Sequence, residues 1–161
     1  MFREMRRKGQ LLSEAEAESI LQRNTSGVLA VLGDEGYPYA VPLSYVYNGS
    51  VIYFHCAKAG HKLDSVMKEA KVSFCVIDQD QIVPEKFTTY YRSVIAFGKA
   101  HVIEETGEKR QAIEALAEKY SPKCEGRDQE IEGASAALGI IRMDIEHMTG
   151  KEARELREKN V

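Results

Sequence analysis

The segment 53–63, YFHCAKAGHKL, combines an apolar run, a turn of small residues and two basic side chains. The pattern predicts that His61 and Lys62 open a helix, where the positive end of the helix dipole disfavours cations by about 0.3–1 kcal/mol. A bound phosphate would remove this conflict, because free N–H groups and the dipole attract anions there. His61 and Lys62 are therefore candidate phosphate ligands, with Lys58 adding positive potential. The alternative is a basic patch that contacts only solvent.

His55 stands near the end of the preceding apolar run, VIYFHC (51–56). Histidine is the commonest general acid and base in proteins, so His55 is a candidate ligand donor or proton source. The alternative is a partly buried structural histidine, because this residue type is intermediate in burial. The other histidines and the three cysteines show neither close metal-ligand spacing nor a CxxC pair. We therefore expect no metal site and no disulfide framework.

The composition fits one globular domain of 161 residues, with 43% hydrophobic and 29% charged residues. A net charge of −3 argues against a nucleic-acid-binding protein, which usually carries a strong basic excess. No apolar run approaches the ~20 residues that span a bilayer, and the N-terminus lacks the apolar stretch of a signal peptide. We therefore expect a cytoplasmic protein without membrane or nucleic-acid partners.

Hydrophobic periodicity predicts a mostly β chain with a few peripheral helices. Ser13 and Glu16 form a capping-box pattern before a helix to about Asn24, a second helix begins at His61, and Thr106 is the candidate cap of a third that ends at Tyr120. Strands are predicted at 27–32, 37–47, 51–56, 71–78, 92–104 and 138–148, and loops at 79–91 and 124–135. Six strands without regular βαβ alternation indicate an antiparallel barrel or sandwich in a single domain, 1–161, with a peripheral arm (1–12) and a solvated tail (149–161).

Four segments in order carry a family resemblance: YPYAVPLSYVY (37–47), IYFHCAKAGHKLDSV (52–66), YYRSVIAFGKAHVI (90–103) and RMDIEHMTGKEA (142–153). Together they resemble the pyridoxamine 5'-phosphate oxidase-like split barrels, and most closely their nitroimidazole-resistance-type flavin branch. The resemblance implies a six-stranded antiparallel split β-barrel that binds FMN at a homodimer interface.

The resemblance also implies the residues of the flavin site. The stretch that runs beneath the flavin matches Tyr39 to Ser44, which includes Val41, Pro42 and Leu43. The aromatic–threonine pair at a strand end matches Phe54 and His55, the phosphate-binding pair matches His61 and Lys62, and the start of a later strand brings in Ser93. Tyr39 and Ser44 replace the Arg and Lys ends of the oxidase branch, and the acidic tail lacks that branch's substrate-binding residues. Oxidation of pyridoxamine phosphate is therefore not expected.

The expected function is that of an FMN-dependent oxidoreductase that reduces a small electrophile, such as a nitroaromatic, with His55 as the catalytic residue. NAD(P)H would supply the electrons and bind only transiently, because no GxGxxG fingerprint is present. Two alternatives stay open: a flavin-binding or sensing module without efficient turnover, and a split barrel that uses deazaflavin, or haem with His55 as axial ligand. The tyrosine-rich stretch 85–94 is interpreted as the rim of a dimer interface or pocket, or else as an ordinary exposed loop.

Overall fold

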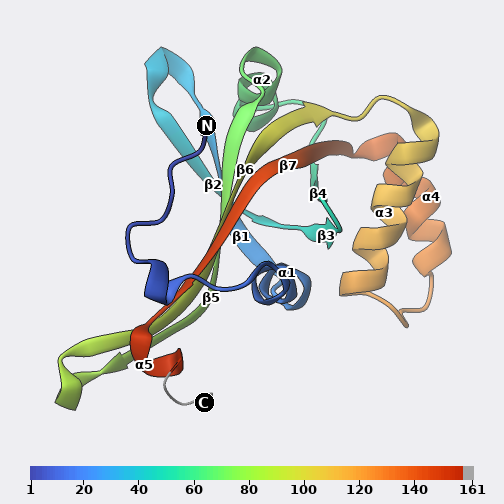
Figure 1. The fold of residues 1–161 in the computed structure, drawn as a ribbon. Coiled ribbons are helices and arrows are strands. Elements are labelled where there is room, and N and C mark those ends of the chain that lie inside the picture. The colour runs from blue at the N-terminus through green and yellow to red at the C-terminus, as the bar shows by residue number, and fades with distance from the viewer. Residues whose placement is uncertain (158–161) are drawn as a thin grey trace.

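Seven antiparallel strands form one open sheet in the computed structural model, which describes residues 1–157 apart from the side chains of residues 135 and 136 (Figure 1). The strand order is β2-β1-β5-β6-β7-β4-β3, and β2 also approaches β4 across the split of the barrel. The strands are β1 (Ser26–Leu32), β2 (Pro38–Ser44), β3 (Val46–Asn48), β4 (Val51–Cys56), β5 (Lys71–Val83), β6 (Thr88–Val102) and β7 (Gly139–Glu152). The helices are α1 (Glu14–Arg23), α2 (His61–Lys68), α3 (Thr106–Tyr120), α4 (Arg127–Ala137) and α5 (Arg154–Arg157), with short 3₁₀ turns η1 (Lys8–Gln10), η2 (Asp34–Gly36) and η3 (Pro84–Lys86).

The antiparallel, mostly β fold with peripheral helices is confirmed, but the sheet has seven strands rather than six. The predicted strand 37–47 is interrupted at Tyr45, which separates β2 from β3. The hydroxyl of Tyr120, at the end of α3, accepts a hydrogen bond from Tyr45 N (2.9 Å) and donates to Tyr45 O (2.7 Å). Both backbone groups that a continuous ladder would use are thus taken by a distant side chain, and β2 ends at Ser44.

The main core lies between α1 and the inner face of the sheet. The capping box predicted from Ser13 and Glu16 is present, and α1 buries Ala17, Ile20 and Leu21. The largest fully buried side chains of this core come from α1 and from five strands or their junctions: Ile20, Leu21, Leu29, Tyr45, Ile52, Phe54, Phe74, Val76, Val94, Ile141 and Met143.

A second core lies on the opposite face of β4, where α3 and α4 stand together beside the sheet (Figure 1). Val51 and Tyr53 point to this face and pack with Ile113, Leu116 and Ile131 of the two helices. The prediction of a loop over 124–135 is wrong, because α4 occupies Arg127–Ala137. Its acidic sequence offers only a weak helical signal, and packing of its apolar face against α3 supplies the stabilisation instead.

A long two-stranded arm replaces the loop predicted over 79–91. β5 continues to Val83 and β6 begins at Thr88, and their pairing includes Asp80 with Tyr91 and Ile82 with Thr89. The arm projects away from the body of the molecule (Figure 1). The arm is held by backbone pairing between the two strands rather than by burial. Its sequence therefore lacks the alternation of apolar and polar residues that indicates a half-buried strand.

Two further boundaries differ from those expected. Glu105, rather than Thr106, caps α3, because its carboxylate accepts hydrogen bonds from Gly107 N (2.7 Å) and Glu108 N (2.5 Å). The predicted solvated tail, 149–161, is not solvated from its start, because β7 runs to Glu152 and both Glu152 and Ala153 are buried. Its last part, 158–161, lies outside the described residues. None of the helices described is long and apolar enough to cross a membrane.

Candidate functional site

The start of α2 lies where the sequence predicts it, with His61 as the first helical residue. Gly60 precedes it with φ 134°, a conformation that side chains other than glycine rarely adopt. Gly60 has no side chain that could cap the first turn, so the N–H groups there remain suited to an anion. His61 is exposed and Lys62 half-buried, which places two basic side chains beside this open helix end.

Two neighbours hold the imidazole of His61. It stacks on the ring of Tyr39 in β2, with centroids 4.2 Å apart and planes 11° from parallel. Its Nε2 also lies 3.5 Å from Oδ2 of Asp34 in η2. The structure thus brings together Tyr39 and His61, both site residues expected from sequence. It adds Asp34, which no sequence pattern indicates because the contact depends on how η2 folds back.

The first turn of α2 lies beside the end of β4, because Leu63 and Cys56 both border Gly139. Burial raises the pKa of the Cys56 thiol, and the positive charge of Lys62 opposes that rise.

The predicted flavin stretch in β2 has two faces, because side chains alternate along a strand. Tyr39, Val41 and Leu43 are half-buried, and Tyr39 and Leu43 pack against the main core. Pro42 and Ser44 are exposed on the opposite side. The outer side therefore offers Pro42 and Ser44 to a ligand that lies on the surface of the sheet.

Phe54 belongs to the main core. Its side chain is fully buried and meets Phe74 edge-on, with ring centroids 5.0 Å apart. Its neighbour His55 points the other way and is exposed. Of this predicted pair, His55 is therefore the member whose side chain can contact a ligand.

An apolar strip crosses the exposed side of the sheet. The register pairs Pro42 with Val28, Val28 with Cys75 and Cys75 with Ile95, so this row of side chains shares one side, called here the outer face. Large apolar side chains remain exposed there, namely Val28, Leu32, Ile77, Ile95 and Phe97. Phe97 at the end of this strip also packs against Phe2 of the N-terminal segment, with ring centroids 5.6 Å apart.

Ser93 does not join the His61 region within one chain. It lies in β6, where it pairs with Ile77 of β5 and Lys151 of β7. Strands β1 and β5 separate it from β2 in the sheet. It shares the outward side of β6 with Ile95, so only a contact across the outer face would bring it to a ligand held at β2.

Ser44 and His55 meet at a cavity of about 580 Å³ between the sheet and the helix pair, called here the α3–α4 pocket. Leu116 and Tyr120 of α3 and Ile131 of α4 contribute to its walls. His55 follows Val51 and Tyr53 on the same face of β4 and lies just beyond the second core. Sequence patterns do not indicate this pocket, because they predict a loop where α4 forms one of its walls.

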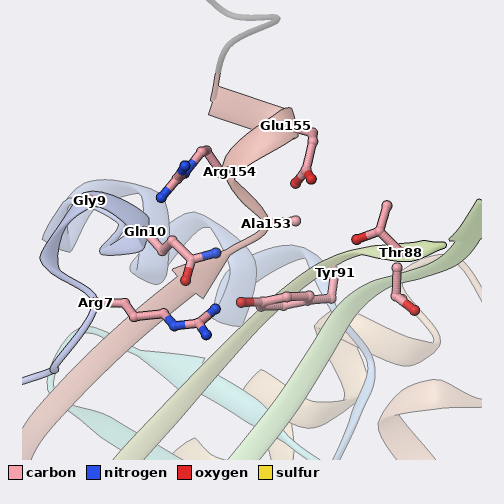
Figure 2. Close-up of a pocket in the computed structure, with 9 residues that line it drawn as sticks. Arg7, Gly9, Gln10, Thr88, Tyr91, Ala153, Arg154 and Glu155 are labelled. Carbon is pink, nitrogen blue, oxygen red and sulfur yellow. The ribbon is translucent and has the colours of Figure 1, made fainter. Parts of the chain in front are cut away.

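A separate polar cavity of about 540 Å³ lies between η1, the base of the arm and α5. Figure 2 shows Arg7, Gln10, Tyr91, Arg154 and Glu155 around it. None of the site residues expected from sequence lines it, although Tyr91 belongs to the tyrosine-rich stretch interpreted as a rim. Across residues 1–157, no three histidine, cysteine or acidic side chains gather as metal ligands would.

Comparison with solved structures finds the same fold. A conserved protein from Mycobacterium tuberculosis has a TM-score of 0.81 at 20% identity, with 96% of this chain and 93% of that chain covered. A candidate 5-nitroimidazole antibiotic resistance protein from Bacteroides thetaiotaomicron has a TM-score of 0.74 at 22% identity, covering 88% and 86%. An FAD-binding protein from Mesorhizobium loti has a TM-score of 0.65 at 26% identity, covering 89% and 97%.

No curated protein matches the sequence. The model of the family described as pyridoxamine 5'-phosphate oxidase, however, matches residues 13–152, which span the sheet from before β1 to the last residue of β7. This match confirms the resemblance carried by the four sequence segments. The chain belongs to the pyridoxamine 5'-phosphate oxidase family.

Proposed function

We propose that this protein is a flavin-dependent oxidoreductase that binds FMN and reduces a small nitroaromatic compound. The observation that carries the proposal is the start of α2, where His61 and Lys62 flank an open helix end and Tyr39 stacks on His61. A phosphate monoester suits this region, because two basic side chains lie at the start of a helix, where the dipole and the N–H groups of the first turn attract anions. FMN carries such a group.

The structural neighbours support a flavin as the ligand and a nitro compound as the substrate. The Mesorhizobium loti protein is described as FAD-binding, and the Bacteroides thetaiotaomicron protein as a candidate for nitroimidazole resistance. We favour FMN over FAD because the basic cluster at 58–62 is compact and the sequence contains no dinucleotide fingerprint. Ser44 and Pro42 on the outer side of β2 would border the flavin ring.

A homodimer would complete the site. The outer face leaves apolar side chains exposed, and two-fold pairing is the commonest way to cover such a surface. Across that interface, Ser93 of the partner subunit would approach Pro42 and Ser44, which a single chain keeps apart from β6. A dimer would therefore bring together the expected site residues of β2 and β6, which lie in separate parts of the sheet within one chain.

The flavin supplies two-electron redox chemistry when bound. The chain's own residues bind and orient the flavin and supply a proton to the substrate. One cycle on a nitro group consumes one NAD(P)H and one proton, and yields a nitroso group, NAD(P)⁺ and one water. His55 is exposed beside Ser44 and would donate a proton to the substrate oxygen. Tyr39 and Asp34 would hold His61 in place against the phosphate.

The direct test compares FMN, FAD and riboflavin by calorimetry, and then mixes the loaded protein with NAD(P)H and a nitroimidazole. We expect FMN to bind most tightly, the flavin absorbance to bleach with NAD(P)H, and the acceptor to restore it. Equal affinity for FAD would rule out the single-phosphate pocket. Tight FMN binding without bleaching would identify a flavin-binding module rather than an enzyme.

A further inference from the structure

The polar cavity between η1, the base of the arm and α5, called here the η1–α5 cavity, differs in character from the α3–α4 pocket. Of the described residues that line it, only Ala153 has an aliphatic side chain, whereas Thr88, Thr89 and Tyr91 contribute hydroxyl groups. Its volume of about 540 Å³ lies within the ~300–1,000 Å³ typical of ligand sites. These walls favour a small polar molecule, whose polar groups need hydrogen-bond partners when they leave water.

Two arginines at this cavity have no ionic partner. Arg7 precedes η1 and Arg154 opens α5, and both side chains are exposed. Neither guanidinium makes a salt bridge or a hydrogen bond with the part of the chain that the structure describes. Glu152, the acidic residue at the end of β7, is buried and already pairs with Arg92 at 2.9 Å and with Arg157 at 3.3 Å. Arg7 and Arg154 are therefore available to a ligand.

The positive groups reach the cavity from different elements. Figure 2 shows the guanidinium of Arg7 pointing toward the hydroxyl of Tyr91, while Arg154 and Glu155 extend from α5. Within residues 1–157 the Tyr91 hydroxyl makes no hydrogen bond, so it can donate to a ligand oxygen. Nζ of Lys151 lies 5.3 Å from the centroid of the Tyr91 ring and adds positive potential. Three cationic side chains thus stand at or beside the cavity against the single carboxylate of Glu155.

This excess of positive charge indicates an anionic ligand. Guanidinium groups bind phosphate and carboxylate oxygens through pairs of N–H donors, and two of them balance the charge of a dianion. Glu155 opposes negative charge on its own side of the cavity. The charged group of the ligand is therefore expected near Arg7, Tyr91 and Arg154, with an uncharged polar part toward Glu155.

We propose that the η1–α5 cavity binds a small polar organic dianion, a phosphate ester or a dicarboxylate, through Arg7, Arg154 and the hydroxyl of Tyr91. The inference goes beyond the proposed function, because none of the residues expected to hold the flavin lines this cavity. The bound ligand would join η1 and α5 to the base of the arm.

Calorimetric titrations with ribose 5-phosphate, malate and uncharged ribose test the class of ligand. They use FMN-loaded protein and, in parallel, flavin-free Lys62→Ala, so that the start of α2 does not contribute. We expect at least one of the two dianions to bind at least about tenfold more tightly than ribose, as charge-assisted hydrogen bonds require. The tighter of the two shows whether the ligand is a phosphate ester or a dicarboxylate.

Single charge changes test the residues. Arg7→Gln and Arg154→Gln should each weaken binding of the dianion about tenfold, the effect of losing one hydrogen bond from a charged donor. Glu155→Gln should instead tighten binding, because it removes a like charge. Arg6→Gln is the matched control, since Arg6 is exposed and adjoins Arg7 but lies outside the lining. FMN affinity should stay unchanged in all four variants, and circular dichroism shows that each one folds.

Several outcomes would overturn the inference. They are no binding of either dianion, equal binding of ribose, or a loss in Arg6→Gln as large as that in Arg154→Gln. Loss of FMN binding in Arg7→Gln or Arg154→Gln would make the cavity part of the flavin site and would also overturn it. If the wild type binds no flavin, the proposed function fails, yet the titrations of flavin-free Lys62→Ala still decide whether the η1–α5 cavity binds a dianion.

Discussion

The imidazole of His61 stacks on the phenol ring of Tyr39, with centroids 4.2 Å apart and planes 11° from parallel. Tyr39 lies in β2 and His61 opens α2, so this contact links the strand expected beneath the flavin to the helix expected at its phosphate. The stack limits the positions that His61 can take when an anion approaches.

This contact predicts an energetic coupling in ligand binding. Tyr39→Ala and His61→Ala should each weaken FMN binding. The double variant should lose less binding free energy than the two single losses added together, with a coupling of about 0.5–1.5 kcal/mol. Calorimetry on the four proteins measures it. Tyr37→Ala, an exposed tyrosine two residues before Tyr39, is the control and should change nothing. Strict additivity would show that the stack plays no part in holding the phosphate.

Lys62→Ala should lower the affinity for FMN by about 10- to 100-fold, because it removes a charge-assisted hydrogen bond to the phosphate worth roughly 1.5–3 kcal/mol. Riboflavin, which lacks the phosphate, should bind the wild type and the variant alike. The flavin-free variant should be no less stable than the wild type, since a cation next to the positive helix end has gone. Lys68→Ala, in the last turn of α2, is the matched control. Equal losses for FMN and riboflavin would show that Lys62 does not hold the phosphate.

The wild type should be a dimer by light scattering at micromolar concentration, with an interface of more than ~2,000 Å² if it is obligate. Ile95→Glu should produce monomers, because it places a charge within the apolar strip of the outer face. Met67→Glu, an exposed position on α2, should leave the dimer intact. A monomeric wild type, or a dimer that tolerates Ile95→Glu, would assign another role to the outer face.

His55→Ala should still bind FMN but reduce a nitroimidazole at least ~100-fold more slowly, the typical contribution of a general acid. Bleaching of the flavin by NAD(P)H should persist, which separates loss of proton donation from loss of cofactor. His101→Ala, an exposed histidine near Asp144, is the control. Unchanged turnover in His55→Ala would return this residue to a structural role.

Asp78 links α1 to β5 and predicts a pH dependence of stability. Burial alone raises the pKa of Asp78. Hydrogen bonds from Arg23 (2.8 and 2.5 Å) and Asn24 (2.8 Å) lower the pKa by a larger amount, so it lies below its ordinary value. A carboxylate with a depressed folded-state pKa stabilises the fold above its ordinary pKa of ~3.9, and this contribution is lost as the pH falls through the folded value.

Asp78→Asn should therefore lower the free energy of unfolding by about 1–2 kcal/mol at pH 7, given that Arg23 is partly exposed. The difference from the wild type should shrink below about pH 4, where the wild-type carboxylate also becomes protonated. Urea titrations at several pH values measure it. Asp80→Asn, at an exposed position two residues along β5, should change stability little. A difference that stays constant down to pH 2 would contradict the assignment.

Local patterns in the sequence determined much of the fold. The capping box of Ser13 and Glu16, the apolar run 51–56 and the basic start of α2 at His61 all rest on contacts between residues close in the chain, or on periodicity that one element shows by itself. Most of the apolar run 51–56 and the start of α2 also belong to a segment that carries the family resemblance, which the family match confirms.

Only the tertiary structure decided the rest, because the deciding contacts join residues far apart in sequence. Tyr120 separates β2 from β3 at Tyr45 by occupying the backbone groups of that residue. The arm beyond Ile77 is held by strand pairing rather than by burial, and α4 is held by α3 rather than by its own helical pattern. The α3–α4 pocket and the stack of Tyr39 on His61 depend on these placements. Sequence periodicity records which side of an element is apolar, whereas the element that covers that side is set by packing across the whole chain.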